Sequence, residues 1–302
     1  MKILFVATVR SHIGQFHMPI IKELKRLGCE IHGAYKDNSD LKKGLDLSPL
    51  DKVFEVPFSR SPYSTDNIKA YKVLKKIIDE NDYDAIHCHT PMGAVVTRLA
   101  AKAARKKGTK VIYTAHGFHF YNGASKKNWL LFYNVEKYLA KYTDCLITIN
   151  SEDYKLATEK QFAVDNIYHV NGVGVDISRF HNIDENEKHN LRAEFGYGDD
   201  DFLMIYPADF CDRKNQNMLF DMLKILLEKR GNFRLLLPGL EEKAQPFIDY
   251  AKSLGVFDKV DIMGYRRDID KLVGMCDVSL SSSKQEGLPI CLLYTSPSPR
   301  DL

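Results

Sequence analysis

Short apolar runs alternate along the chain with longer stretches in which apolar residues recur at helical spacing. The apolar runs predict strands near residues 3–8, 30–34, 52–56, 85–89, 110–114, 145–149 and 167–170, and again near 203–207, 233–237, 260–263 and 278–280. The helical spacings predict helices near residues 14–27, 67–80, 92–107, 127–141 and 152–162, and again near 217–230, 241–254 and 267–275. Since alternation of helices with strands that are apolar on both faces is typical of parallel sheets covered by helices, we predict an α/β protein.

A glycine-containing segment, residues 171–190, separates the two series of elements. Gly172 and Gly174 permit sharp turns of the backbone, and the polar run NIDENEKHN follows them. With 302 residues, the chain is long enough for two domains of ordinary size. We therefore predict one Rossmann-like domain over residues 1–172 and a second one over residues 173–290.

Composition is that of a soluble globular protein. Hydrophobic residues make up 44% of the chain, charged residues make up 27%, and a net charge of +3 gives no indication of nucleic-acid binding. No apolar run approaches the roughly 18 residues of a transmembrane helix, and the start MKILFVATV lacks a signal-peptide cleavage site, so we interpret it as a buried strand. The six cysteines are scattered singly, which favours a reducing cytoplasm.

The ends of two predicted strands bear on cofactor and metal binding. After the first strand, a dinucleotide-binding turn would carry Gly-x-Gly-x-x-Gly, but only Gly14 is present. At the end of the fourth strand, alternation places His87 and His89 on one face, but zinc requires three or four ligands and no further ligands stand nearby in the sequence. We therefore expect no NAD and no bound metal, and we interpret both histidines as caps on the wall of a cleft.

The stretch 277–294, DVSLSSSKQEGLPICLLY, passes from a buried strand through a serine-rich turn to an acidic Gly-Leu-Pro helix start. Such a turn places backbone N–H groups and a carboxylate at the carboxyl edge of a parallel sheet, where phosphates bind. The stretch resembles the donor-sugar motif of the family-4 glycosyltransferases, which are retaining enzymes of the two-domain GT-B fold. That motif carries two glutamates with seven residues between them; Glu286 matches the first, and Tyr294 stands in place of the second.

The closing run CLLYTSPSPRDL, residues 291–302, looks like a translated sequencing adapter. We therefore expect the native sequence to stop near Ile290 and the second domain to be incomplete, with a natural Pro/Ser-rich tail as the alternative. The resemblance implies that the missing glutamate binds ribose hydroxyls and that closing helices return to the first domain. We accordingly expect this chain to bind nucleotide weakly and to turn over little or no donor.

The segment 114–123, TAHGFHFYNG, is the part of the first half that most resembles family 4. Those enzymes are similar in having a strand-end histidine that faces the transferred sugar, which implies a catalytic role for His116 through hydrogen bonding; a histidine satisfied within its loop is the alternative. The wider run 115–150 resembles the capsule and exopolysaccharide subgroup. The resemblance also makes three residues of the first turn candidates on the acceptor side, with ordinary turn chemistry as the alternative: Arg10, His12 and Gly14.

The resemblance further implies a donor-binding set in the second half. In PADFCDRKNQN, residues 207–217, Lys214 matches the lysine that holds the donor diphosphate, whereas Asp209 stands at the position of the family's arginine and Arg213 is the candidate substitute. The other donor-binding candidates lie in turns that follow predicted strands: Asn215, Gly239, Tyr265, Arg266, Gly287 and Leu288. Gly239 would let the nucleotide pass close to the backbone, and Tyr265 or Arg266 would stack on uracil, with loop packing as the alternative.

The predicted helix over residues 127–141 carries more aromatic residues than packing on a sheet requires. Five residues share one face and are expected to pack on the sheet: Leu131, Val135, Tyr138, Leu139 and Tyr142. Trp129, Phe132 and Tyr133 would then be exposed beside lysines, a pattern that fits contact with a membrane interface, and the basic run 101–110 would add attraction to anionic lipid. Interdomain packing of the aromatics and a solvated basic face are the alternative.

Together these features predict a retaining glycosyltransferase that moves a sugar from a nucleotide donor, expected to be a UDP-sugar, to a lipid-linked glycan in surface polysaccharide synthesis. Lys214 and Arg213 would offset phosphate charge, Glu286 would position the donor sugar, and the leaving phosphate would accept the acceptor's proton. The resemblance implies no cofactor and no metal, and the acidic run 199–201 is interpreted as a solvated turn because it precedes a strand.

The expected partners are the donor, the lipid-linked acceptor and an anionic membrane surface, and not nucleic acid. We expect a cytoplasmic protein, peripheral on the inner face of the membrane. Two alternatives stay open: another GT-B sugar-nucleotide enzyme such as a 2-epimerase, and a non-enzymatic nucleotide-sugar-binding protein. Identification of the released sugar separates the first alternative from transfer.

Overall fold

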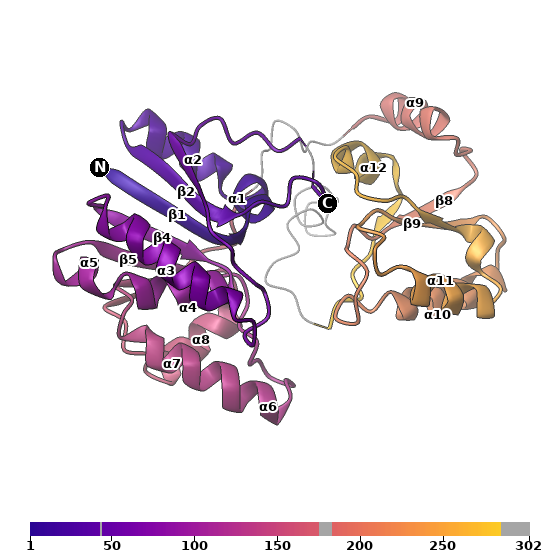
Figure 1. The fold of residues 1–302 in the computed structure, drawn as a ribbon. Helices are drawn as coiled ribbons and strands as arrows, with labels where there is room; N and C mark the ends of the chain where they lie inside the picture. Colours follow the sequence, from indigo (N-terminus) through magenta and orange to yellow (C-terminus); the bar gives the residue numbers. More distant parts are fainter. Residues whose placement is uncertain (43, 175–182, 285–302) are drawn as a thin grey trace. The chain divides into compact units, whose positions relative to one another are not determined.

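A computed structural model describes residues 1–42, 44–174 and 183–284 of the chain (Figure 1). Its contacts divide the chain into two compact units, Met1–Gly174 and Val175–Leu302. The division falls two residues after the predicted domain end at residue 172. The tail predicted over residues 291–302 lies outside the described residues.

The first unit is built on a seven-stranded sheet in which neighbouring strands are parallel, in the order β3-β2-β1-β4-β5-β6-β7. Its strands are β1 (Lys2–Val9), β2 (Glu30–Lys36), β3 (Lys52–Glu55), β4 (Ala85–His89), β5 (Lys110–Ala115), β6 (Cys145–Thr148) and β7 (Asn166–His169). Its helices are α1 (Arg10–Phe16), α2 (Met18–Arg26), α3 (Asp66–Asp79), α4 (Pro91–Ala100), α5 (Lys102–Lys106), α6 (Lys126–Asn128), the π-helical turn η1 (Trp129–Tyr133), α7 (Asn134–Ala140) and α8 (Ser151–Glu159).

Alternate residues of β1 pack into two different cores because successive side chains of a strand point to opposite faces. Leu4 and Val6 pack with apolar residues of α3 and α4, whereas Ile3 and Phe5 pack with apolar residues of α1 and α2. Figure 1 shows helices on both faces of this sheet. The central strands are therefore buried on both sides, as their nearly continuous apolar sequence predicts.

The second unit repeats this plan with a four-stranded parallel sheet in the order β10-β9-β8-β11. Its elements are α9 (Glu185–Phe195), β8 (Phe202–Ile205), α10 (Gln216–Leu227), β9 (Phe233–Leu237), α11 (Gln245–Ser253), the 3-10 turn η2 (Phe257–Lys259), β10 (Val260–Ile262), α12 (Ile269–Met275) and β11 (Val278–Ser279). One core packs Met204 against α10 and α11, and the other packs Leu203 against α9 and α12. The predicted α/β class is confirmed in both units.

Two helices, α1 and α9, differ from the prediction in an informative way. The strand β1 runs directly into α1 at Arg10, so the predicted turn before Gly14 is wrong; burial of Ile13 against the sheet favours helix from the first residue after the strand. The helix α9 was not predicted, because its sequence is polar on most of its surface. Its local signals are caps: Asp184 accepts a hydrogen bond from the backbone N–H of Glu187, and Gly196 ends the helix with a φ of 80°.

The predicted helix over residues 127–141 contains the π-helical turn η1, which changes the residues that face inward. The prediction that Trp129, Phe132 and Tyr133 are exposed is wrong, because all three pack, partly buried, against the core of the first unit. Tyr138, predicted to pack on the sheet, is instead 53% exposed. Throughout the part of the chain that the structure describes, no helix is both long and apolar enough to cross a membrane.

A recurring hydrogen bond fixes the amino edge of both sheets. An aspartate next to the start of one strand accepts the backbone N–H of a residue at or near the start of the neighbouring strand. The four bonds run from Lys2 to Asp84 (2.6 Å), from Ile31 to Asp51 (2.7 Å), from Val111 to Asp144 (2.7 Å) and from Leu203 to Asp277 (2.8 Å). These carboxylates satisfy N–H groups that would otherwise lack a partner at the sheet edge. The amino edges are thus occupied by structural contacts, which leaves the carboxyl edges for ligands.

Candidate functional site

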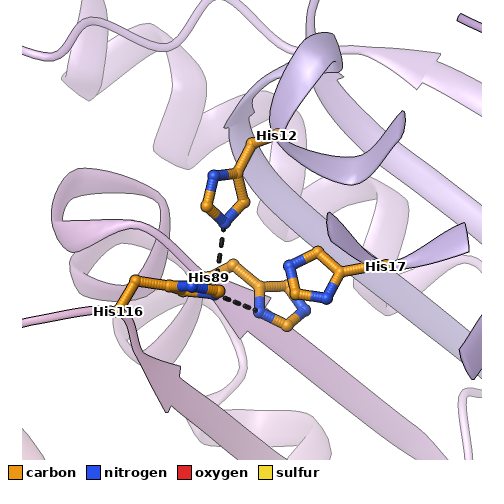
Figure 2. Close-up of side chains that lie close together, drawn as sticks. All are labelled: His12, His17, His89 and His116. Atoms are coloured by element: carbon orange, nitrogen blue, oxygen red, sulfur yellow. Dashed lines mark hydrogen bonds between the residues drawn. The ribbon is translucent and has the colours of Figure 1, made fainter. Parts of the chain in front are cut away.

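Four histidines meet at the carboxyl edge of the first sheet, where β1, β4 and β5 end side by side (Figure 2). His12 lies in α1, His17 joins α1 to α2, His89 is the last residue of β4, and His116 directly follows β5. The boundary between β1 and β4 is the point where the strand order reverses, because the chain proceeds outward from β1 in one direction and from β4 in the other. Ligands of open α/β sheets bind at this switch point.

The imidazole rings are within contact distance of one another. The Nε2 atoms of His12 and His116 lie 3.2 Å apart, and Nε2 of His116 lies 3.5 Å from Nδ1 of His89. The rings of His17 and His89 stack with their centroids 3.7 Å apart. His87, which sequence alternation placed beside His89, points its Nε2 to the hydroxyl of Thr114 at 2.8 Å instead of joining the group.

Burial keeps these imidazoles uncharged at neutral pH. It lowers the pKa of His116 to about 4. Burial, with smaller contributions from neighbouring histidines, also lowers the pKa values of His12, His17 and His89 well below the usual value. A neutral imidazole has one N–H donor and one nitrogen lone pair, so the group can hydrogen-bond a hydroxyl or coordinate a metal, but it offers no charge to an anion.

The loop after His116 is anchored by its aromatic residues and by one carboxylate. Phe118 and Phe120 are buried in the core and stack on each other at 4.7 Å. The carboxylate of Asp153 in α8 accepts the backbone N–H of Phe118 at 3.0 Å. Gly117 has a φ of 123°, a conformation that favours glycine directly after the histidine. The segment 114–123 thus holds the His116 side chain at the sheet edge.

The other two candidates in the first unit mainly position a loop. The guanidinium of Arg10 donates to the carbonyl oxygen of Leu45 at 2.9 Å and lies 3.8 Å from the carboxylate of Asp37. A Cβ atom at Gly14 would lie 3.1 Å from the Leu45 side chain, which explains why glycine suits this position in α1. Both contacts favour a structural role for Arg10 and Gly14, while His12 joins the histidine group.

A strained residue follows His89. Thr90 has a φ of 63° and a ψ of 148°, a region that β-branched residues rarely adopt. Its hydroxyl accepts the backbone N–H of Thr8 at 3.0 Å and lies 2.6 Å from the Thr8 hydroxyl, so the end of β4 is tied to β1. This link fixes the backbone from which His89 projects.

The candidates of the second unit come from turns at the carboxyl edge of its sheet. Arg213, Lys214 and Asn215 fall in the loop between β8 and α10, with Asn215 in the left-handed region at a φ of 55° as the residue before the helix. The serine turn after β11 lies against this loop: the hydroxyl of Ser282 donates to the carbonyl oxygen of Lys214 at 2.9 Å, and the N–H of Lys284 donates to that of Arg213 at 2.9 Å.

These hydrogen bonds join two distant segments that the sequence pattern assigned to one site. Tyr206, at the end of β8, strengthens the junction by donating to the carbonyl oxygen of Lys214 at 3.2 Å and by sharing a hydrogen bond with Ser283. The donor candidates Glu286, Gly287 and Leu288 follow directly in the sequence and lie outside the described residues.

Gly239 is required by a close approach between two turns. A Cβ atom at this position would collide with the carbonyl oxygen of Ala208, and the N–H of Gly239 donates to the carbonyl oxygen of Gly264 at 2.8 Å. Asp209, which stands where the family has an arginine, accepts the backbone N–H of Leu240 at 3.0 Å. The turns after β8, β9 and β10 are therefore linked through their backbones along one edge.

The two candidates for stacking on a base differ in their surroundings. The guanidinium of Arg266 is paired with the carboxylate of Asp268, with Nε donating at 2.8 Å, and lies 5.4 Å from the ring centroid of Phe195. These contacts favour loop packing for Arg266. Tyr265 lies in the same turn after β10, and its role in stacking stays a prediction.

Sequence reasoning missed His17 and the serine contacts of the second unit, and it assigned His89 to a cleft wall with His87 and not to a group with His12 and His116. His17 and His89 lie far apart in the sequence, and only the order of the strands shows that they come together. The available signal was that three neighbouring strands each lead to a histidine. For Ser282 and Tyr206 the signal was their place beside the predicted donor loop.

Comparison with known proteins matches each unit to a family. Residues 2–150 match the family described as "Glycosyl transferase 4-like", and residues 187–293 match the family described as "Glycosyl transferases group 1". The two matches fall within the two units, Met1–Gly174 and Val175–Leu302. The order of the matches along the chain is the order that the sequence motifs predict.

Individual relatives extend this likeness over nearly the whole chain. The "Putative glycosyltransferase EpsD" of Bacillus subtilis (strain 168) is 43% identical over 292 residues, which cover 97% of this chain and 75% of that protein. The UDP-Gal:alpha-D-GlcNAc-diphosphoundecaprenol alpha-1,3-galactosyltransferase of Escherichia coli is 24% identical, with 75% of this chain and 57% of that protein covered. The crystal structure of Anabaena Alr3699/HepE in complex with UDP and glucose is similar with a TM-score of 0.71 at 19% identity, over 96% of this chain and 76% of that chain, which shows a shared fold.

Proposed function

This chain belongs to the glycosyltransferases of the 4-like and group 1 families with the GT-B fold, and from that premise we propose that it moves a sugar from a UDP-sugar to a hydroxyl of a lipid-linked glycan, with retention of configuration. Family membership shows that the chain is a glycosyltransferase of the exopolysaccharide type. The identity of the donor nucleotide, the acceptor and the retention of configuration are proposed in addition.

The single observation that carries the proposal is the hydrogen-bonded junction at the carboxyl edge of the second sheet. Ser282 and Lys284 hold the carbonyl oxygens of Lys214 and Arg213, so the segment that leads to Glu286 begins beside the two cations. The loop that carries both cations leads directly into the N-terminus of α10, and a basic loop at a helix N-terminus suits a diphosphate. In the proposed reaction, Lys214 and Arg213 offset the negative charge that develops on the leaving UDP.

In the first unit, we assign His116 the role of a hydrogen-bonding partner for the transferred sugar. Its lowered pKa, about 4 because of burial, keeps the imidazole neutral at pH 7. A neutral ring can orient a hydroxyl without attacking the anomeric carbon. The leaving phosphate would then accept the proton of the acceptor hydroxyl on the same face of the sugar, which is how the proposal accounts for retention.

A lipid-linked acceptor agrees with the acceptor printed in the name of the Escherichia coli relative, a GlcNAc-diphosphoundecaprenol. Peripheral contact with an anionic membrane is the matching proposal. Because Trp129, Phe132 and Tyr133 pack against the core, its support comes from lysine side chains. Lys102 lies 4.2 Å from the ring centroid of Tyr142, and Lys141 lies 3.9 Å from that of Tyr138. Flotation of the protein with vesicles that contain anionic lipid tests this; loss of flotation in 0.5 M salt is expected, since surface attraction is screened.

The decisive experiment measures UDP release from a panel of UDP-sugars with and without a lipid-linked acceptor, followed by identification of the sugar product. Transfer to the acceptor supports the proposal. Free sugar of altered configuration at C2 would indicate an epimerase instead. Binding of UDP-sugar without any product, also in a chain extended to the full length of its relatives and carrying the family's second glutamate, would indicate a binding protein.

Two further expectations belong to the proposal. We expect little or no turnover by this chain as it stands, because Tyr294 occupies the position of the ribose-binding glutamate. Robust transfer without substitution would contradict that. We also expect UDP binding to survive treatment with EDTA, since Lys214 and Arg213 supply the positive charge on the diphosphate. A requirement for Mg²⁺ in UDP binding would contradict this.

A further inference from the structure

The histidine group at the carboxyl edge of the first sheet has more nitrogen atoms than its hydrogen bonds use. One ligand atom from each of His12, His17, His89 and His116 can be chosen so that all lie within 4.8 Å of one another. Two of the residues are deeply buried, His89 at 0% and His17 at 4% exposure, while His12 and His116 are partly accessible. The group thus has a buried side, formed by His17 and His89, and a partly accessible side, formed by His12 and His116.

Two buried nitrogen atoms of this group lack a partner. Among the residues that the structure describes, Nε2 of His17 and Nε2 of His89 form no hydrogen bond. A buried polar atom without a partner costs about 1–3 kcal/mol, so a fold rarely retains two in adjacent side chains unless something binds them. The stacked rings of His17 and His89 place both atoms in the same small region (Figure 2).

We propose that His12, His17, His89 and His116 bind one divalent transition-metal ion of the Zn²⁺ type. Neutral imidazole nitrogen is the ligand that such ions prefer, whereas Mg²⁺ and Ca²⁺ require oxygen ligands, and the group contains no carboxylate. The proposal replaces the sequence-based expectation of a site without metal.

The observed distances are close to those of a tetrahedral site. With Zn–N bonds of about 2.0–2.1 Å, neighbouring nitrogen atoms lie about 3.3–3.4 Å apart. The separation of 3.2 Å between Nε2 of His12 and Nε2 of His116 is close to that value. The farthest pair, within 4.8 Å, has to approach by no more than about 1.4 Å, and the stacked rings of His17 and His89 have to fan apart so that both lone pairs point at the ion.

Thiolate ligands are not needed to complete the site. Cys88 is next to His89 in the sequence, but its thiol donates to the carbonyl oxygen of Ile112 at 3.3 Å, and burial raises its pKa to about 12. The predicted coordination is therefore nitrogen only. Both proposals involve His116, but metal binding is measured without any nucleotide sugar, so the two can fail separately.

The test begins with protein stripped of metal by EDTA and then freed of the chelator. Zn²⁺ is titrated in competition with a chromophoric chelator, in parallel with Mg²⁺ and Ca²⁺. One Zn²⁺ per chain is expected, with no binding of Mg²⁺ or Ca²⁺ at the same concentrations. X-ray absorption of the loaded protein is expected to show nitrogen ligands at about 2.0–2.1 Å and no sulfur.

Variants assign the binding to the four residues. His17→Ala and His12→Ala are each expected to weaken Zn²⁺ binding about tenfold or more, since each removes one of four ligands. His169→Ala, at an exposed histidine of the same unit outside the group, is the matched control and is expected to retain wild-type affinity. If buried His17→Ala does not fold, the partly exposed His12→Ala decides. Absence of Zn²⁺ binding by the wild-type chain, wild-type affinity in His12→Ala, or sulfur in the coordination shell would overturn the proposal.

Discussion

The carboxyl edges of the two sheets carry opposite chemistry on the same architecture. At the first edge, four uncharged imidazoles from three neighbouring strand ends form the candidate site, and side-chain packing holds them. At the second edge, backbone turns are hydrogen-bonded to one another, as in the bond from Gly239 to Gly264, and the notable side chains are the cations Arg213 and Lys214. Parallel strands bring both sets of residues to an edge, but only residue chemistry decides what each edge can bind.

This difference shows which substitutions each edge tolerates. The first edge depends on aromatic packing, so loss of an apolar side chain should displace imidazoles that the substitution does not touch. The second edge depends on main-chain hydrogen bonds, so most side-chain substitutions should leave its shape intact and change only charge. Four substitutions test this contrast, in order of decreasing expected effect.

The largest effect is expected from Phe120→Ala at the first edge. Phe120 is fully buried, stacks on Phe118 at 4.7 Å and meets the ring of Trp129 at 5.6 Å. Loss of a buried phenylalanine costs about 3–5 kcal/mol because it combines lost transfer energy with a cavity. The chain has one tryptophan, so urea unfolding followed by fluorescence of Trp129 reports on the first unit.

Leu130→Ala is the control for that measurement. Leu130 lies beside Trp129 in the sequence but is 74% exposed, so a change within about 0.5 kcal/mol is expected. Equal losses of stability in the two variants would show that the aromatic loop is not what holds the first edge.

The second prediction concerns charge at the second edge. Lys214→Ala is expected to weaken UDP binding about 10- to 100-fold, since a hydrogen bond to a charged group is worth about 1.5–3 kcal/mol. Isothermal titration of UDP measures the change. Lys224→Ala, on the exposed side of α10, removes the same charge from the same unit and is expected to leave UDP affinity unaltered.

If Lys214→Ala and Lys224→Ala lost UDP affinity equally, Lys214 would act only through long-range charge attraction and not through contact with the diphosphate. Hydrogen exchange of the β8 backbone should be the same in wild type and Lys214→Ala, because the side-chain change leaves the turn's main-chain bonds in place. A large increase in that exchange would contradict the distinction between a packed edge and a backbone-built edge.

The third prediction turns to the amino edge of the second sheet. Asp277 accepts the N–H of Leu203 and lies 2.7 Å from Arg192. Burial opposes ionisation of Asp277, but its hydrogen bonds to Lys188, Leu203 and Arg192 outweigh burial and lower its pKa. A carboxyl group whose pKa is lower in the folded state stabilises the fold above its unfolded pKa, about 3.9, and loses that contribution as pH falls through the folded value.

Asp277→Asn should therefore destabilise the second unit by about 1–2 kcal/mol at pH 7, a value discounted for partial exposure. The difference from wild type should shrink as pH falls below about 4. Hydrogen exchange of β8 and β11 over a pH series measures it. A difference that does not depend on pH would show that the carboxylate charge makes no contribution.

Much of this architecture could be predicted from the sequence. Apolar runs give the strands because a strand buried on both faces needs apolar residues in succession. The family resemblance made the loop around Lys214 and the histidine at 116 site candidates. Both follow predicted strands, and the carboxyl ends of parallel strands share one edge of a sheet. Periodicity is thus informative wherever secondary structure alone fixes the position of a residue.

The failures have physical causes that periodicity does not contain. The π-helical turn shifts the helical register at Trp129, so residues expected at the surface face the core. The helix α9 is stabilised by its caps rather than by an apolar stripe. The histidine group depends on strand order: His89 and His116 are neighbours only because β4 pairs with β5, and the addition of His17 requires the place of α1 beside β1.

The smallest effect is expected from Ser282→Ala, which removes one hydrogen bond from the backbone-built edge. The hydroxyl of Ser282 donates to the carbonyl oxygen of Lys214 at 2.9 Å, and a single neutral hydrogen bond contributes about 0.5–1.5 kcal/mol. Because the N–H of Lys284 and the hydroxyl of Tyr206 also hold this loop, UDP affinity should fall only about two- to fivefold. Ser281→Ala, one residue earlier and exposed, should leave affinity unchanged in the same titration. A loss as large as that in Lys214→Ala would mean that the position of the loop, and not the charge of the lysine, governs binding at the second edge.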